Sequence, residues 1–241
     1  MEVSSTGCKA AETIGEVMSE YSRFAVYYLP EPGHLADFGA KWLGWDAQSG
    51  LDRSPFDVPD WDTVTRTPRK YGFHGTLKPP FRLAAGQDLH SLDSAMHDLA
   101  SRVAPAQATS LALTRLGRFL ALTPVGDGSD IARVAAAYVR DLDSFRAPPS
   151  PAELERRRSV GLTPEQDAHL LRWGYPYVLD QFRFHLTLTG RLNGDLLART
   201  QDLLKRILPP LPKPFQLNSV CLLGERPDGL FELVHRYSLV G

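Results

Sequence analysis

The chain has 241 residues, enough for one large domain or two small lobes with a substantial core. Its apolar share of 43% and charged share of 23% are those of an ordinary globular protein. The formal net charge of −1 gives no overall basic surface of the kind that long nucleic acids select. These values leave room for a small anionic ligand held by a local cluster.

The cysteines and the N-terminus bear on location. Cys8 and Cys221 lie in unlike contexts and do not form a metal-type pair. No disulfide framework, signal peptide or apolar run of membrane-spanning length is evident, so we expect a cytoplasmic protein with no membrane contact. Met1–Ser22, rich in small and polar residues, is expected to be a flexible tail.

The predicted elements alternate between strands and helices. In chain order, we expect a strand over Arg23–Leu29, a helix over Gly33–Trp45, a surface loop over Ser49–Thr67, a strand within Tyr71–Leu83, a helix over Asp88–Val103 and a hairpin over Thr109–Leu116 and Arg118–Thr123. We then expect helices over Ser129–Phe145, Ala152–Arg158 and Pro164–Trp173, a strand within Phe182–Leu192, a helix over Asp195–Ile207, and strands over Phe215–Leu223 and Leu230–Leu239.

Two of these strands carry the same pattern, a histidine and a threonine two residues apart. The first copy holds His74 and Thr76, and the second holds His185 and Thr187. Because side chains alternate between the faces of a strand, each histidine shares a face with its threonine, and apolar residues occupy the opposite face. A single His-x-Thr strand is weak evidence, but two copies in matching surroundings indicate a functional pair.

The surroundings of the two copies also repeat. Each His/Thr strand is followed by an amphipathic helix and then by a pair of strands, at a separation of about 110 residues. We therefore predict an α+β fold with two pseudo-symmetric lobes of antiparallel sheet and helices around a central cleft, spanning residues 23–241. The segment 129–177 has no counterpart in the second half and is predicted to be a helical insertion.

Two facing imidazoles suit the in-line displacement at a phosphorus atom. A neutral histidine takes a proton from the attacking water while an imidazolium protonates the leaving oxygen, and a pKa near 6.5 permits both roles. The hydroxyls of Thr76 and Thr187 would donate hydrogen bonds to the phosphoryl oxygens. This arrangement needs no metal and no cofactor, and the sequence does not distinguish the base from the acid.

Other catalytic classes fit the sequence less well. Neither His/Thr strand has the acidic, histidine or cysteine neighbours that zinc requires. The sequence also lacks a Gly-x-Ser-x-Gly elbow and a glycine-rich nucleotide-phosphate loop.

Four further residues are candidates for substrate binding. Lys78 lies two residues beyond the first motif and Arg183 two residues before the second. Strand alternation therefore predicts that both side chains lie on the same face as the histidines. Tyr71 and Tyr177 are candidates for lining the cleft. For Arg156–Arg158 we favour a solvated helix face over a second phosphate site.

At these motifs the sequence resembles the 2H phosphoesterase superfamily, and in particular a branch associated with phosphonate-utilisation operons. The resemblance is carried by His74-Gly-Thr76 and His185-Leu-Thr187, and by the stretches RFAVYYLP, FGAKWLGWD, RKYGFHGTLKPPFRL, LGRFLALTP, DSFRAPPSPAELERRR and LLRWGYPYVLDQFRFHLTLTGRL. It implies a bilobal fold and metal-independent hydrolysis or ligation of cyclic or 2′,5′ phosphodiesters. It also implies that these two histidines and two threonines are the catalytic residues.

We therefore expect a hydrolase, a cyclic phosphodiesterase, that acts on a small phosphorylated substrate. The phosphonate link suggests a ribose cyclic phosphate, and the nearly neutral charge argues against long nucleic acid. One alternative is an RNA-end 2′,3′-cyclic phosphodiesterase or 2′,5′ RNA ligase, which needs a basic track with stacking aromatics. Another is a non-catalytic phosphate- or nucleotide-binding protein.

Overall fold

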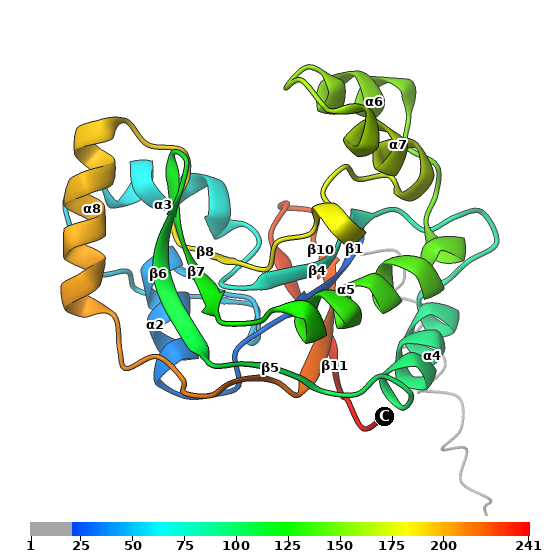
Figure 1. Ribbon diagram of the computed structural model, residues 1–241, viewed down its shortest axis with the longest axis horizontal. Helices are drawn as coiled ribbons and strands as arrows, with labels where there is room; N and C mark the ends of the chain where they lie inside the picture. Colours follow the sequence, from blue (N-terminus) through cyan, green and yellow to red (C-terminus); the bar gives the residue numbers. More distant parts are fainter. Residues whose placement is uncertain (1–20) are drawn as a thin grey trace, which may run out of the picture.

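A seven-stranded antiparallel sheet runs through the protein in a computed structural model that describes residues 21–241 (Figure 1). The strand order is β11-β10-β1-β4-β8-β7-β6. The strands of this sheet are β1 (Phe24–Tyr28), β4 (Gly75–Phe81), β6 (Ser110–Leu116), β7 (Phe119–Val125), β8 (Leu186–Thr187), β10 (Ser219–Glu225) and β11 (Phe231–Ser238). The expected tail, Met1–Ser22, lies almost entirely outside the described residues.

Two short strand pairs and a set of helices complete the described chain. The pairs are β2 (Trp45–Asp46) with β3 (Leu51–Asp52), and β5 (Ala106–Ala108) with β9 (Phe215–Leu217). The helices are α2 (His34–Leu43), α3 (Trp61–Arg69), α4 (Leu89–Ala100), α5 (Ser129–Asp141), α6 (Pro151–Arg158), α7 (Pro164–Trp173) and α8 (Gly194–Ile207), with 3₁₀ turns η1 (Asp143–Phe145) and η2 (Leu179–Gln181). None of these helices is both long and apolar enough to span a membrane.

The predicted repetition of the two halves is confirmed and explains the sheet order. Each half runs strand, helix, short strand and hairpin, as β4-α4-β5-β6-β7 and as β8-α8-β9-β10-β11. The hairpins are exchanged, since β6 and β7 join the sheet beside β8 while β10 and β11 lie on the side of β4. The short strands β5 and β9 pair with each other. The α+β fold thus has two lobes whose central strands, β4 and β8, are neighbours.

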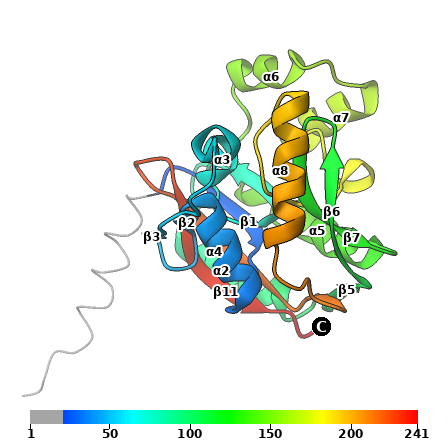
Figure 2. The same cartoon turned by 90° about the vertical axis from the view of Figure 1, so that its left-hand side faces the viewer.

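Helices α2, α4, α5 and α8 cover one face of the sheet. Helix α4 packs on β10 and β11, α5 on β4, and α8 on β7. The face that they cover holds the main core, to which alternate residues of β1 such as Val26 and Tyr28 contribute. Figure 2 shows α2 and α8 together on the side toward the viewer. A smaller cluster on the opposite face includes Tyr27, Trp45 and Phe231.

One expectation about the helices needs correction. The expected loop Ser49–Thr67 overlaps helix α3, because Val64, Thr65 and Pro68 bury one narrow face of an otherwise polar segment. The segment 129–177, predicted to be a helical insertion, holds α5, α6 and α7, and Ile131 and Val134 of α5 are buried core residues. Only the part that carries α6 and α7 projects from the sheet, raised above one end of the molecule in Figure 1.

Candidate active site

The two His-x-Thr motifs meet at the junction of the two lobes. Gly75 of β4 pairs with Leu186 of β8 in antiparallel register. Continuing that register sets His74 opposite Thr187 and Thr76 opposite His185, with opposed Cα atoms about 4.5–5.5 Å apart. Because successive side chains along a strand point to opposite faces, and opposed residues of paired strands point to the same face, all four polar side chains share one face of the sheet.

The opposite face is apolar, as the strand alternation predicted. The residues Phe73, Leu77, Phe184, Leu186 and Leu188 all belong to the main core. Gly75 lies against the ring of Phe184, and a Cβ atom there would come within 2.4 Å of it. The glycine inside the first motif therefore permits the close approach of the two central strands.

His74 is buried and held in a defined tautomer. Its Nδ1 lies 2.9 Å from the carbonyl oxygen of Gly72, which can only accept, so Nδ1 carries the proton. Its Nε2 lies 3.0 Å from Thr76 Oγ1 and accepts the threonine proton. The ring stacks on Tyr27 with centroids 3.9 Å apart. Burial, with a smaller contribution from the nearby His185, lowers the pKa of His74 to about 4, so the imidazole is neutral near pH 7.

The ring of His185 is held by its Nδ1 in the same way as the ring of His74. Its Nδ1 lies 2.8 Å from the carbonyl oxygen of Arg183, also two residues upstream, so Nε2 is again the free ring nitrogen. The side chain is half-buried, and its ring lies 5.8 Å from that of Phe119. Both histidines thus turn Nε2 away from their own backbone.

A cavity of about 310 Å³ opens beside the first motif, and we call it the histidine cavity. Its lining includes His74, Thr76 and Thr187, while His185 lies at the junction outside this lining. Of the sequence-predicted binding residues, Tyr71 lines it. The residues Arg23, Tyr27, Thr67, Pro68, Pro79, Pro80, Arg157, Tyr175 and Thr189 complete the wall.

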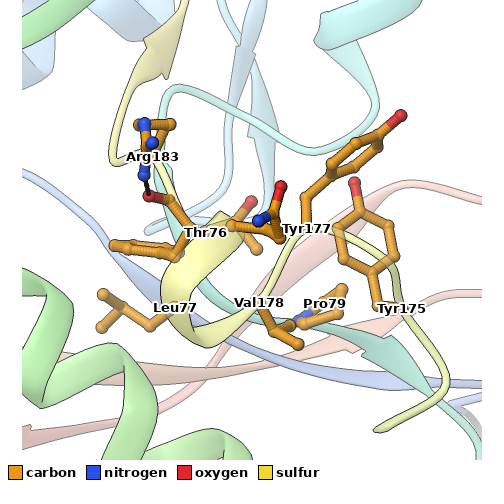
Figure 3. A pocket seen from close by; sticks show the side chains of 9 residues that line it. Thr76, Leu77, Pro79, Tyr175, Tyr177, Val178 and Arg183 are labelled. Carbon is orange, nitrogen blue, oxygen red and sulfur yellow. Dashed lines mark hydrogen bonds between the residues drawn. The ribbon is translucent and has the colours of Figure 1, made fainter. Parts of the chain in front are cut away.

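A second, smaller pocket of about 160 Å³ adjoins this cavity through Thr76, Pro79 and Tyr175 (Figure 3). Tyr177 and Arg183 both line this side pocket. Figure 3 shows Arg183 at one end and the rings of Tyr175 and Tyr177 at the other. The Arg183 guanidinium donates to the carbonyl oxygens of Asp180 and Phe182, at 3.2 and 2.7 Å, and remains exposed.

Lys78 does not reach either pocket, which corrects its prediction as a binding residue. A bulge in β4 pairs Tyr27 with Thr76 but Val26 with Lys78, so the lysine joins Val26 on the core face. It is 2% exposed, and its Nζ donates to the carbonyl oxygen of Val139 at 3.0 Å. Burial lowers its pKa to about 8.

The charge of the histidine cavity comes from two arginines. Arg23 donates to both oxygens of Glu225 and is neutralised by it. Arg157 lies over the ring of Tyr175, 4.6 Å from its centroid. Sequence reasoning assigned Arg156–Arg158 to a solvated face, which holds for Arg158, paired with Asp167, but Arg157 lines the cavity. Tyr27, which also lines the cavity, was not predicted, although strand alternation sets it on the face opposite Val26 and Tyr28.

The lining chemistry is that of an anion site. No aspartate or glutamate of residues 21–241 lines the histidine cavity. The wall offers arginine cations and the hydroxyls of several threonines and tyrosines. The described chain also contains no cluster of three or more histidine, cysteine and acidic residues suited to a metal. Such a cavity favours a phosphorylated ligand rich in oxygen atoms.

A family model and curated relatives each match a large part of this chain. Residues 76–232 match the family described as "Protein of unknown function (DUF1045)". A curated relative, "Ribose 1,5-bisphosphate phosphokinase PhnN" of Janthinobacterium sp. (strain Marseille), is 36% identical over 178 residues, which are 71% of this chain and 39% of that protein. The chain thus spans about two-fifths of the length of the curated relatives that it matches.

Similar solved structures are distant. TT0787 of Thermus thermophilus aligns over 91% of this chain and 98% of its own, with 16% identity and a TM-score of 0.44. E. coli LigT complexed with 3′-AMP aligns over 92% of this chain and 100% of its own, with 14% identity and a TM-score of 0.42.

Proposed function

This chain belongs to the DUF1045 family, and for it we propose the metal-independent hydrolysis of a small cyclic phosphodiester by a pair of histidines. The observation that carries the proposal is the junction of β4 and β8, where the pairing of Gly75 with Leu186 sets both His-x-Thr motifs on the same face of the sheet. Two imidazoles and two hydroxyls at one point match the needs of in-line displacement at phosphorus.

The environment of His74 supports its role as the general base. Its pKa of about 4 keeps Nε2 unprotonated near neutral pH, and the bond from Nδ1 to Gly72 fixes that nitrogen as the acceptor. On binding, the Thr76 hydroxyl would turn from His74 to a phosphoryl oxygen and free Nε2 for the water proton. His185, as imidazolium, would then be the general acid.

The proposed step balances as a simple hydrolysis. Water attacks phosphorus and gives one proton to His74 Nε2, while the bond between phosphorus and one ring oxygen breaks. That oxygen takes a proton from His185 Nε2, leaving a phosphomonoester and a free hydroxyl. Thr76 and Thr187 donate hydrogen bonds to the non-bridging oxygens as negative charge grows on them.

The size of the cavity and the names of the relatives support a phosphorylated ribose. A volume of about 310 Å³ is at the lower end of the range for small-molecule sites. The relatives are named for ribose 1,5-bisphosphate phosphokinase. A kinase that takes its phosphate from a nucleotide usually needs a glycine-rich phosphate loop, which this sequence lacks. We therefore propose that the chain acts on a related sugar phosphate by hydrolysis rather than by phosphoryl transfer.

The test is a turnover assay with a chelator present throughout. The substrates are ribose 1,2-cyclic phosphate 5-phosphate, nucleoside 2′,3′-cyclic phosphates and a 2′,5′-linked dinucleotide. We expect hydrolysis of the sugar cyclic phosphate at the highest kcat/KM. Preference for the nucleotides would move the function to RNA ends with the same histidines. Binding of all three without turnover would make the protein a phosphate sensor and overturn the proposal.

A further inference from the structure

Arg157 is a cation in the wall of the histidine cavity for which the proposed hydrolysis has no use. The other cavity arginine, Arg23, is held by Glu225 through two hydrogen bonds. No carboxylate in the described chain forms a salt bridge with Arg157, and its one close partner is the ring of Tyr175. A half-buried guanidinium packed flat on an aromatic ring loses little further conformational freedom when it binds an anion.

The helix that carries this arginine is fixed at both ends. Glu153, one turn before Arg157 on the same side of α6, caps the helix through Ser150 and pairs with Arg82 at 2.6 Å, just beyond β4. Arg158 pairs with Asp167 of α7 at 2.6 Å. The i,i+4 carboxylate that would otherwise neutralise Arg157 is thus occupied elsewhere. The projecting pair α6 and α7 therefore presents an unpaired cation to the cavity.

We infer that Arg157 binds a second, non-reacting phosphomonoester of the substrate, which is accordingly a small sugar carrying phosphate groups at two positions. The inference rests on the proposed function for the position of the reacting phosphodiester. The two histidines and the threonine hydroxyls receive the reacting phosphate at the junction of β4 and β8. Arg157 binds the other phosphate where it lies over the ring of Tyr175. Bidentate guanidinium contacts suit the oxygens of a terminal phosphate.

Kinetics of the Arg157→Gln variant test this assignment. The two substrates are a ribose cyclic phosphodiester with a terminal 5-phosphate and the same compound without that phosphate. We expect Arg157→Gln to raise KM about 10- to 100-fold for the phosphorylated compound, with kcat within about twofold, since a contact equal in the ground and transition states changes KM alone. The unphosphorylated compound should show no change. Arg156→Gln, an exposed neighbour outside the cavity lining, is the matched control.

A binding measurement separates this inference from the proposed function. Calorimetric titration with ribose 5-phosphate should show binding to the wild type and at least about tenfold weaker binding to Arg157→Gln, whether or not any cyclic phosphate is hydrolysed. If wild type and Arg157→Gln both hydrolyse the substrates and prefer the phosphorylated one by the same factor, the Arg157 site alone would be overturned. Tighter binding of adenosine 5′-phosphate than of ribose 5-phosphate would overturn the assignment to a small sugar.

Discussion

The two His-x-Thr motifs are equivalent in sequence but differ in how the fold holds them. The first leads into β4, a seven-residue strand paired on both sides, and its histidine is 8% exposed and stacked on Tyr27. The second lies on β8, a two-residue strand, and its histidine is half-buried beside Phe119. The histidine of the first motif is thus shielded from water, and the histidine of the second motif is partly exposed to it.

In the proposed hydrolysis, this difference is the basis for assigning the base to one copy of the motif and the acid to the other. Burial disfavours the imidazolium at His74 and keeps that ring neutral. The half-buried ring of His185 is the one left to protonate the leaving oxygen in the proposed hydrolysis. Pairs of titratable groups in unlike environments are the usual source of opposite roles in acid–base catalysis.

The largest expected effect comes from removing either ring. His74→Ala and His185→Ala should each lower kcat by about 10²- to 10⁴-fold, because each removes one proton transfer. His97→Ala, at an exposed position on α4, is the control and should retain wild-type activity. Activity that survives both catalytic substitutions would show that the two motifs do not act as a pair.

The burial of His74 should also appear in the stability of the protein. The unfolded chain binds a proton at a pKa near 6.5, whereas the folded chain resists protonation until about pH 4. The free energy of unfolding should therefore fall by roughly 3 kcal/mol as the pH falls from about 6.5 to 4. Urea unfolding of wild type and His74→Gln across this range measures the effect, since glutamine does not titrate. An identical pH dependence in both proteins would contradict the burial of His74.

The threonines should contribute less than the histidines. Thr76→Val and Thr187→Val each remove one hydroxyl donor to the phosphoryl oxygens, and we expect kcat to fall by about 10²-fold. Thr114→Val, in the hairpin of β6 and β7, is a control of the same size change. A loss in Thr76→Val but none in Thr187→Val would mean that only the first motif contacts the reacting phosphate.

The smallest effect is expected at Lys78. Its ammonium donates to the carbonyl oxygen of Val139 on the core side of the bulge, away from both pockets. Lys78→Met should leave kcat and KM within about twofold of wild type, as measured in the same assay. A large rise in KM would restore the lysine to the substrate site.

The sequence predicted the parts of the fold that follow local rules. Strand alternation placed Phe73 and Leu186 in the core and both histidines on the other face, and the repeated order of strand, helix and hairpin predicted the two lobes.

What the sequence missed depends on contacts between distant segments. Strand alternation predicted that Lys78 shares a face with the histidines. The bulge that moves Lys78 to the core face arises from the pairing of β4 with β1 and has no signal in the local sequence. Arg157 was assigned to solvent because its role arises from Tyr175 and the cavity beyond it. Helix α3 was missed because only a few of its residues are buried.

The most direct test of the two-histidine account is the pH dependence of kcat/KM in wild type, His74→Ala and His185→Ala. We expect kcat/KM of the wild type to fall on the acid side near pH 4, where His74 takes up a proton. The residual activity of His74→Ala should lack this acid limb, and that of His185→Ala should keep it. An acid limb that persists unchanged in His74→Ala would contradict the assignment of the general base to His74.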